Sequence, residues 1–313
     1  MVKWRRWATC TAVAISMISS VHAETVDLST LFPEQTVRSC GSASEPLRLS
    51  KNEPLVLIVH GCFASEGQFK ALSEVYAELG QQTACFEYDD RRRLDDVAAD
   101  LIDAANTLSP VLGDQKLTVL GHSQGGLITR RAATDHDSDG KHIIHHPLEI
   151  ATISAPFKGI EVASHCGTTW LRVASLGIVD AICYAVTGAK YLDIPPQAEF
   201  IEMPGELLPQ LDRHLIIKTD EVNTCRIQDA NGQCIKDDYV FSLTEQSKSR
   251  VDRSVQGQAI TVHAGHAEIV GNETVTPWKL IEVLQRYGLM ATPDPSDVET
   301  FTMSVNRIYQ RFI

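Results

Sequence analysis

Short apolar runs alternate along the chain with segments whose apolar residues recur at helical spacing. The run at 55–60 is almost wholly aliphatic, which is typical of a strand buried on both faces. The next segment, 69–79, has helical spacing and ends at Gly80. Strands alternating with helices in this way predict a mostly parallel sheet covered by helices on both faces. Further strands are predicted at 83–88, 117–120, 150–154, 215–218 and 259–263, and further helices at 97–108, 126–133, 277–287 and 296–313.

The strand at 117–120 leads directly into Gly121-His122-Ser123-Gln124-Gly125, and a helical pattern follows at once. Strand, sharp turn and helix around G-x-S-x-G form the context of a nucleophile elbow, which strains Ser123 and lifts its hydroxyl out of the sheet. The glycines leave room where strand and helix approach closely. The backbone N–H of Gln124, at the helix start, would face an oxyanion on a carbonyl attacked by Ser123. We therefore predict Ser123 as a catalytic nucleophile.

Two further motifs supply partners for this serine. His60-Gly61-Cys62 follows the first buried strand, and we predict the N–H of Cys62, rather than its sulfur, as the second oxyanion donor. His266 lies in the loop after the last predicted strand of the sheet, where an imidazole can reach back to Ser123. His263 still belongs to that strand, so His266 is the predicted general base.

The acid that orients His266 should lie between Ser123 and His266 in chain order, at the end of a strand. Three aspartates meet this description. Asp220 comes soon after the strand at 215–218, whereas Asp237 and Asp238 precede Tyr239-Val240-Phe241-Ser242. The order of elements alone leaves the choice open.

The alternation of strands and helices breaks once, at about 160–213, where no strand is predicted. This insertion holds two apolar stretches, 170–179 and 181–186. Connections of this length in a compact domain usually serve a function. We expect a cap or lid whose apolar face covers the Ser123 pocket, with polar residues outward.

Residues 1–23 have the pattern of a signal peptide. Lys3, Arg5 and Arg6 precede a short apolar core at 8–19, and Val21-His22-Ala23 is a small-residue cleavage site. The core is too short to span a bilayer. We predict cleavage after Ala23 and export to the periplasm or the medium, which leaves 24–313 as one large domain containing the insertion.

The charge balance narrows the range of partners. The full chain carries a net charge of −12. Without its three N-terminal basic residues, 25 basic residues face 40 acidic ones, a net charge of −15. An acidic surface argues against nucleic acid and anionic membranes as primary partners.

Cysteine spacing suggests disulfides, which export would permit. We predict Cys225–Cys234 across a turn-rich segment and Cys166–Cys183 across an apolar stretch of the insertion. Cys40, Cys62 and Cys85 should give one pair and one leftover thiol. The chain has no C-x-x-C motif to support a zinc site.

Two polar clusters have some features of metal sites. His142, His145 and His146 lie together, but no second group of ligands accompanies them. Residues 135–140 resemble half of a calcium loop, but its twelfth position is His146 rather than the bidentate Glu that affinity requires. We expect neither a metal nor a cofactor.

The motifs together resemble a secreted bacterial lipase or esterase of the α/β-hydrolase superfamily. The resemblance spans 55 to about 285 and implies an α/β-hydrolase fold with a cap or lid. In such lipases the acid commonly begins an Asp-x-apolar-apolar-Ser/Pro run, which favours Asp238. Cys62 departs from the pattern, which has a bulky apolar residue after His-Gly, and Glu268 matches one ligand of a calcium site that some of these lipases hold. The segments that carry the resemblance are 59–63, 121–126, 154–159, Met203-Pro204-Gly205 with Leu207, Leu208 and Leu211, 238–242, and Gly265-His266.

The expected activity is hydrolysis of a small-molecule or lipid ester through an acyl-enzyme, by a triad of Ser123, His266 and Asp238. A thioesterase or an acyltransferase would use the same residues, as would a peptidase. The alternative from a different class is a non-catalytic binding protein on a hydrolase fold. Transient contact with a lipid surface, the acyl length and the oligomeric state are left open by the sequence.

Overall fold

The computed structural model describes residues 24–41, 47–62, 69–135, 140–163, 188–229, 231–271 and 275–311. The predicted signal peptide lies outside these residues. So do the two apolar stretches of the insertion and the predicted Cys166–Cys183 bridge. Within the described ranges, no helix is long and apolar enough to cross a membrane.

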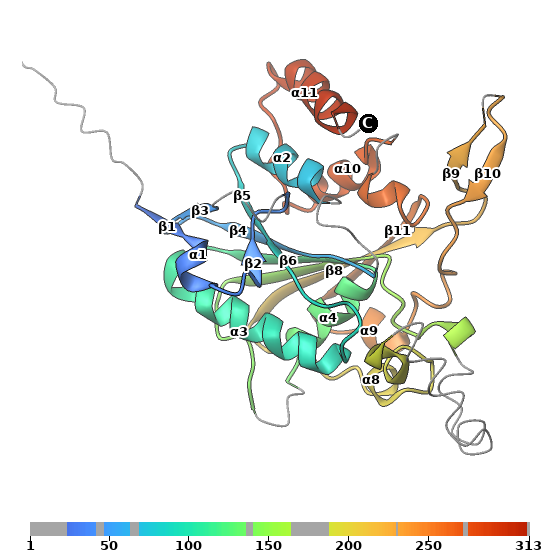
Figure 1. Cartoon of the computed structure of the whole chain (residues 1–313), viewed down its shortest axis with the longest axis horizontal. Coiled ribbons are helices and arrows are strands. Elements are labelled where there is room, and N and C mark those ends of the chain that lie inside the picture. The colour runs from blue at the N-terminus through green and yellow to red at the C-terminus, as the bar shows by residue number, and fades with distance from the viewer. Residues whose placement is uncertain are drawn as a thin grey trace, which may run out of the picture.

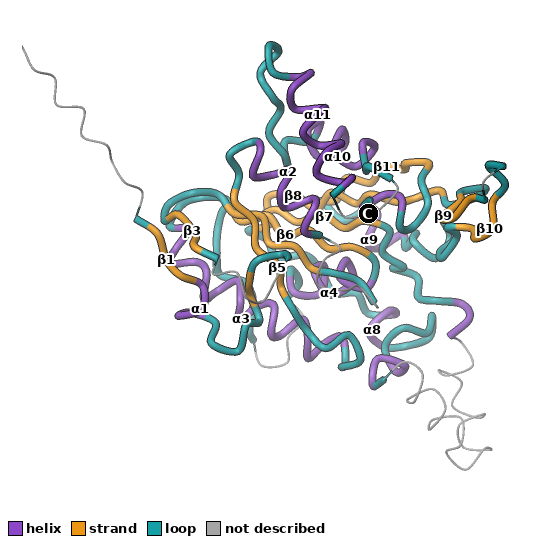
Figure 2. Tube along the Cα trace, turned by 45° about the horizontal axis from the view of Figure 1, so that its top comes forward, coloured by secondary structure: helices purple, strands orange, loops and turns teal. Residues whose placement is uncertain are grey.

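A seven-stranded sheet forms the centre of the molecule, in the order β11-β8-β7-β6-β4-β5-β2 (Figures 1 and 2). Neighbouring strands from β11 to β5 pair in parallel, and β2 joins β5 antiparallel. This confirms the predicted mostly parallel sheet. Its strands are β2 (Val37–Arg38), β4 (Leu55–Val59), β5 (Gln82–Phe86), β6 (Leu117–His122), β7 (Leu148–Ile153), β8 (Leu211–Asp220) and β11 (Gly257–His263).

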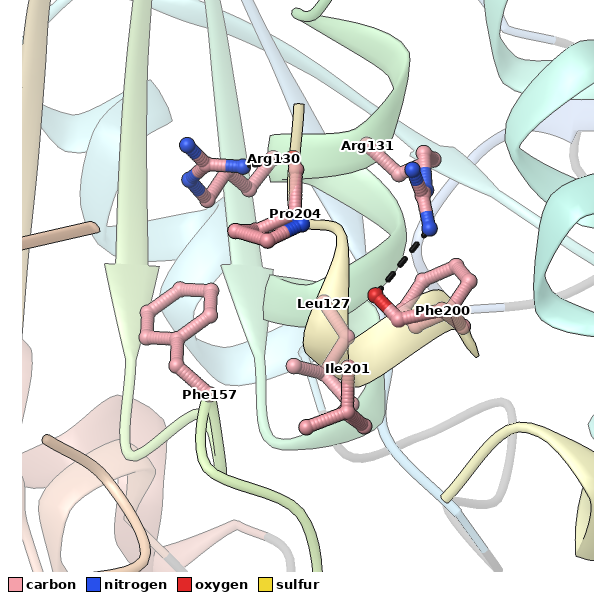
Figure 3. A pocket seen from close by; sticks show the side chains of 7 residues that line it. All are labelled: Leu127, Arg130, Arg131, Phe157, Phe200, Ile201 and Pro204. Atoms are coloured by element: carbon pink, nitrogen blue, oxygen red, sulfur yellow. Dashed lines mark hydrogen bonds between the residues drawn. The ribbon is translucent and has the colours of Figure 1, made fainter. Parts of the chain in front are cut away.

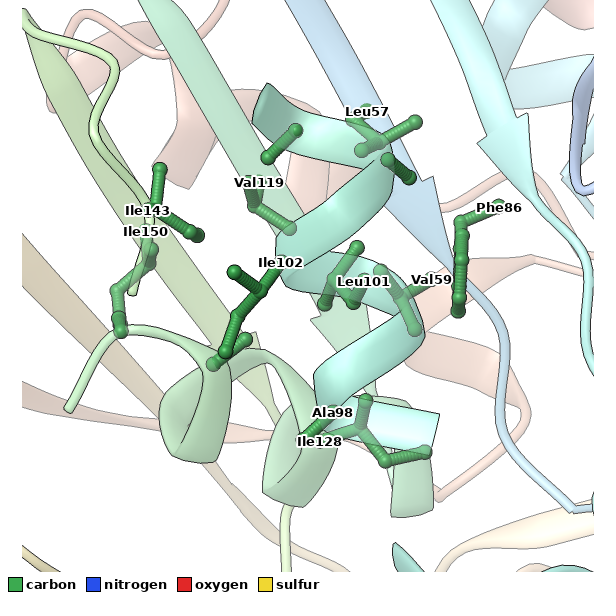
Figure 4. Close-up of a cluster of buried hydrophobic side chains, with 14 of the residues drawn as sticks. Leu57, Val59, Phe86, Ala98, Leu101, Ile102, Val119, Ile128, Ile143 and Ile150 are labelled. Atoms are coloured by element: carbon green, nitrogen blue, oxygen red, sulfur yellow. The ribbon is translucent and has the colours of Figure 1, made fainter. Parts of the chain in front are cut away.

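Helices cover both faces of this sheet. On one face lie α3 (Leu94–Leu112) and α4 (Gln124–Ala132), and on the other lie α2 (Lys70–Glu78), α10 (Trp278–Arg286) and α11 (Val298–Gln310) (Figure 1). Every residue of β4 is buried because its alternate side chains serve the two layers. Leu57 and Val59 pack with Leu101 of α3 (Figure 4), whereas Val56 and Ile58 belong to the apolar cluster of α2.

Several smaller elements lie outside the seven-stranded sheet. A projecting hairpin follows β8 along the chain (Figure 1) and is formed by β9 (Cys225–Gln228) and β10 (Cys234–Asp237). β1 (Thr25–Asp27) pairs with β3 (Arg48–Ser50) in a separate two-stranded sheet. The remaining short helices are α1 (Leu28–Leu31), α8 (Glu199–Glu202) and α9 (Ser249–Asp252), with 3-10 turns at Glu161–Ala163, Ala189–Leu192 and Glu268–Val270.

Two disulfides are present in the described residues. Cys225–Cys234 staples the β9–β10 hairpin, as predicted. Cys40–Cys85 ties the chain beside β2 to β5, and Cys62 is a free thiol. The expectation of one pair and one leftover among these three cysteines is therefore confirmed.

The buried His214 of β8 makes stability depend on pH. Its side chain is 0% exposed, with Nε2 2.9 Å from Thr152 Oγ1. Burial, assisted by the charge of Arg130, holds the pKa of His214 well below its usual range. An unfolded histidine takes up a proton near pH 6.5, whereas the folded one resists it, so stability is expected to fall as pH drops below about 6.5.

Thermal melts between pH 7.5 and 5.5 test this dependence. We expect the wild-type Tm to decline over this window, and His214→Gln to melt lower at pH 7.5 but with a shallower decline. The surface residue His263, changed to Gln, is the control and should keep the wild-type slope. Parallel curves for the wild type and His214→Gln would contradict the prediction.

Candidate active site

Ser123 occupies a strained turn between β6 and α4. Its backbone lies at φ 57° and ψ −123°, in the left-handed region that a residue with a Cβ rarely adopts. The turn is held because Ser123 N donates to Ile153 O at 2.8 Å. Gly125 is required there, since a Cβ at this position would meet the carbonyl oxygens of Val59 and His60 at 2.3 Å. The local geometry is therefore that of the predicted elbow.

The loop after β4 passes directly against this turn. A Cβ on Gly61 would lie 2.9 Å from the Cβ of Ser123. Cys62 follows, and its thiol contacts Oε1 of Gln124, the first residue of α4. The two predicted oxyanion donors, Cys62 and Gln124, are thus neighbours of each other and of Ser123.

His266 lies in the loop after β11, beside the elbow. The ring of His122 lies 4.7 Å from the His266 ring, and His122 Nε2–H donates to the carbonyl oxygen of His266 at 3.1 Å. Phe241 packs edge-on against the His266 ring at 4.9 Å. Burial, with the nearby His266, keeps the pKa of His122 well below its usual range, so His122 packs there as a neutral ring.

The carboxylate at the His266 ring belongs to Glu221. His266 Nδ1 lies 3.0 Å from Glu221 Oε1 and 2.9 Å from the Ser154 hydroxyl, which itself donates to Glu221 Oε1 at 2.8 Å. Thr219 Oγ1 also donates to Oε1, at 2.8 Å. The side chain comes from the first residue after β8 and is 1% exposed. Glu221 is not among the three acids that the sequence predicts.

The second oxygen of Glu221 is equally well bound. The backbone N–H groups of Val240 and Phe241 donate to Oε2 at 2.6 and 2.8 Å. Burial by itself would raise the pKa of Glu221, but the bond to His266, its charge and these two N–H groups together lower it. An ionised carboxylate against Nδ1 fixes the proton on that nitrogen and leaves Nε2 free to accept one.

Asp238, the favoured acid, holds the backbone of the His266 loop instead. Its Oδ2 accepts the N–H groups of Ala267 and Glu268 at 2.9 and 2.8 Å. Its Oδ1 binds Arg226 of β9 at 2.6 and 2.8 Å. The structure therefore places Glu221, not Asp238, at the imidazole, because the carboxylate of Asp238 is fully engaged by the loop and the hairpin.

The other two candidates lie away from the His266 ring. Asp237 is the last residue of β10 and is exposed. Asp220 Oδ2 lies 3.9 Å from the exposed His263. Asp220 is the last residue of β8 and Glu221 the first residue after it, and the carboxylate that contacts the buried His266 ring is that of Glu221.

The C-terminal stem of the insertion, residues 188–205, is anchored to the body. Asp193 accepts Arg93 Nε at 2.8 Å and caps the start of α3 by accepting Leu94 N at 2.8 Å. Arg130 and Arg131 of α4 donate to four carbonyls of the stem, those of Phe200, Met203, Pro204 and Gly205. Strand β8 begins at Leu211, within the range predicted for the insertion.

A small hollow lies between α4 and this stem (Figure 3). It is lined mainly by apolar side chains, and its lining includes neither Ser123 nor His266. We assign it no part in the chemistry. The lining residues are Leu127, Arg130, Arg131, Phe157, Phe200, Ile201 and Pro204.

Two of the three neighbouring histidines make hydrogen bonds within the fold, and His142 Nδ1 lies 3.2 Å from Gly140 O. His145 is buried, with Nδ1 2.9 Å from Ser109 Oγ and Nε2 2.8 Å from Gln115 O. Across the described ranges, no three metal-ligating side chains gather in one group. Most of the half calcium loop, 136–139, falls outside those ranges. Glu268 is bound to Lys279 at 2.6 Å and to Gly265 N at 2.9 Å.

No family model matches the sequence, and no curated protein does. Solved structures do match. The lipase BlEst2 of Bacillus licheniformis in its propeptide form superposes with a TM-score of 0.53 at 13% identity, over 78% of this chain and 51% of that one. Its mature form gives 0.49 at 12% identity, over 75% and 92%. The butyrate-bound esterase Est2 of Thermogutta terrifontis gives 0.45 at 12%, over 82% and 96%. Together with the sheet order, the first of these matches establishes that the chain has the α/β-hydrolase fold.

Proposed function

We propose that this protein is an exported serine hydrolase that cleaves carboxylic esters, with Ser123 as nucleophile, His266 as general base and Glu221 as the orienting acid. The observation that carries the proposal is the Glu221–His266 pair, 3.0 Å apart, beside a serine at positive φ. A serine at positive φ between a strand and a helix is strained, and such strain concentrates at functional sites.

The first half of the reaction acylates the enzyme. Ser123 Oγ attacks the ester carbonyl carbon, and its proton passes to His266 Nε2. The carbonyl oxygen becomes an oxyanion held by the N–H groups of Cys62 and Gln124, each worth roughly 3 kcal/mol in the transition state. The tetrahedral species expels the alcohol oxygen, which takes the proton from His266 and leaves an acyl-serine.

The second half releases the acid. Water gives a proton to His266 and attacks the acyl carbon, and the proton then returns to Ser123 Oγ as the carboxylic acid departs. Glu221 stays ionised and stabilises the imidazolium in both halves. Asp238 holds the loop that carries the base. These steps need no metal or cofactor.

Export rests on the N-terminal pattern at 1–23 and is supported by the two disulfides, since such bonds persist in oxidising compartments. A panel of p-nitrophenyl esters from acetate to palmitate, presented to protein lacking residues 1–23, tests the activity. Acyl thioesters and an added alcohol acceptor form separate arms. Preferred turnover of either would place the same site in a thioesterase or an acyltransferase.

We expect that the cap does not open at a lipid surface, because its C-terminal stem is anchored to the body of the protein. Because Arg93–Asp193 and the carbonyl contacts of α4 fix residues 188–205, we expect short to medium acyl esters to be cleaved as dissolved monomers. The rate against tributyrin should follow a simple saturation curve through the solubility limit. A sharp rise once droplets form would overturn the fixed cap and place the protein with the interface-activated lipases.

A further inference from the structure

The thiol of Cys62 belongs to a closed ring of polar contacts that includes the side chains of both residues proposed as oxyanion donors. Lys190 Nζ donates to Cys62 Sγ at 3.0 Å and lies 3.4 Å from Asp90 Oδ2. The Cys62 thiol contacts Gln124 Oε1, and Gln124 Nε2 donates to the carbonyl oxygen of Asp90 at 3.2 Å. The ring thus joins four segments that are distant in the sequence.

Two residues of this ring, Cys62 and Gln124, also supply the backbone N–H groups proposed above as oxyanion donors. Their side chains are tied to each other and to groups that take no part in the reaction. Burial raises the pKa of the Cys62 thiol, although Lys190 acts against this rise. The sulfur therefore stays protonated, so that its S–H faces Gln124 while a lone pair accepts from Lys190.

Within the ring, Lys190 is the residue that comes from the predicted insertion. It lies in the 3-10 turn Ala189–Leu192 and is 2% exposed, and an ammonium so deeply buried is kept there only by well-placed partners. Its own turn is fixed, because Ala189 N donates to Arg91 O at 2.6 Å and Asp193 binds Arg93. The ammonium thus connects the anchored stem to the loop that carries Cys62.

We propose that Lys190 is a positioning residue that couples the cap to the oxyanion hole. Through the sulfur of Cys62 and the amide of Gln124, it holds the two donor N–H groups at the spacing that the developing oxyanion requires. The hole is complete only while the cap stem is seated on the loops after β4 and β5. The inference rests on the proposed function, because it takes the roles of Cys62 and Gln124 from it.

The test compares Lys190→Met with Lys218→Met in protein lacking residues 1–23. Lys218 is the matched control, a mostly buried lysine on β8 that lies 2.9 Å from Asp252 and 2.9 Å from Ser247 and is not part of the ring. We expect Lys190→Met to lower kcat about 10- to 100-fold, an effect no larger than that of removing one oxyanion-hole donor. KM should stay within about threefold of the wild-type value. Lys218→Met should keep kcat within about twofold, although both variants lose a buried ion pair.

A double-mutant cycle with Cys62→Ala separates positioning from general damage. If Lys190 acts through the sulfur, the double variant should be no slower than the slower single variant, within about twofold. The inference would be overturned if the kcat losses of the two single variants multiplied in the double variant. It would also be overturned if folded Lys190→Met kept its kcat or was impaired only in KM. If Lys190→Met does not fold, Asp90→Asn takes its place. It should lower kcat several-fold, and an unchanged kcat would overturn the proposal.

The Ser123→Ala variant keeps the two proposals apart. Residual hydrolysis by Ser123→Ala means that the proposed function fails. Complete loss in Ser123→Ala together with full activity in Lys190→Met means that only the positioning role of Lys190 fails.

Discussion

Replacing Ser123 with alanine is expected to abolish ester hydrolysis, with kcat falling by about 10⁴- to 10⁶-fold. In the proposed mechanism the hydroxyl is the attacking group, and alanine offers no group to replace it. The fold should persist, because the turn is held by Ser123 N on Ile153 O and by the close fit of Gly125, neither of which uses the hydroxyl. Initial rates on the best p-nitrophenyl ester, with a thermal melt of each protein, make the measurement.

Ser73→Ala is the matched control, because Ser73 is a partly buried serine on α2 whose hydroxyl contacts Thr83. It should retain wild-type kcat within about twofold. A fluorophosphonate probe should label the wild type and the control but not Ser123→Ala. More than a few per cent residual activity, or labelling of Ser123→Ala, would rule out Ser123 as the nucleophile.

The central strands β4, β6 and β7 could be predicted because they are buried on both faces. β4 is aliphatic throughout, since alternate residues must satisfy two apolar layers, and such runs are visible in any sequence. The ends of the elements were less predictable. β8 extends from Leu211 to Asp220, beyond the apolar run at 215–218, because parallel pairing with β11 continues to the His263–Asp220 register.

The C-terminal boundary of β8 explains why the sequence does not predict Glu221 as the acid. The acid of the proposed triad also follows a strand, but the apolar run at 215–218 predicts a strand end at residue 218, whereas β8 ends at Asp220. The Asp-x-apolar-apolar-Ser run of the lipases that the sequence resembles favours Asp238 instead. In the structure this run serves the site differently, because Val240 and Phe241 donate their N–H groups to Glu221 while the Phe241 ring packs on His266.

The contacts of the Cys62 sulfur could not be predicted from the sequence either. The His-Gly motif indicates where the N–H of Cys62 lies, because that depends only on the strand end. Lys190 is 128 residues away from Cys62 and lies in an insertion without periodic strands. Only the folded arrangement of the stem brings this ammonium to the thiol.

The two buried acids should respond differently to loss of charge, although both lie close to His266. Glu221→Gln is expected to lower kcat by about 10³- to 10⁴-fold, because an amide no longer fixes the proton on His266 Nδ1 or stabilises the imidazolium. Asp238→Asn should lower kcat less than about tenfold and depress Tm, since its amide oxygen can still accept from Ala267 and Glu268 while the charge facing Arg226 is lost. The exposed Asp237, changed to Asn, serves as the control, with kcat within about twofold of wild type. Steady-state kinetics and thermal melts of the three variants decide between the two carboxylates. If Asp238→Asn were nearly inactive and Glu221→Gln remained active, the role of triad acid would return to Asp238, because the kinetic effect must follow the group that orients the imidazole.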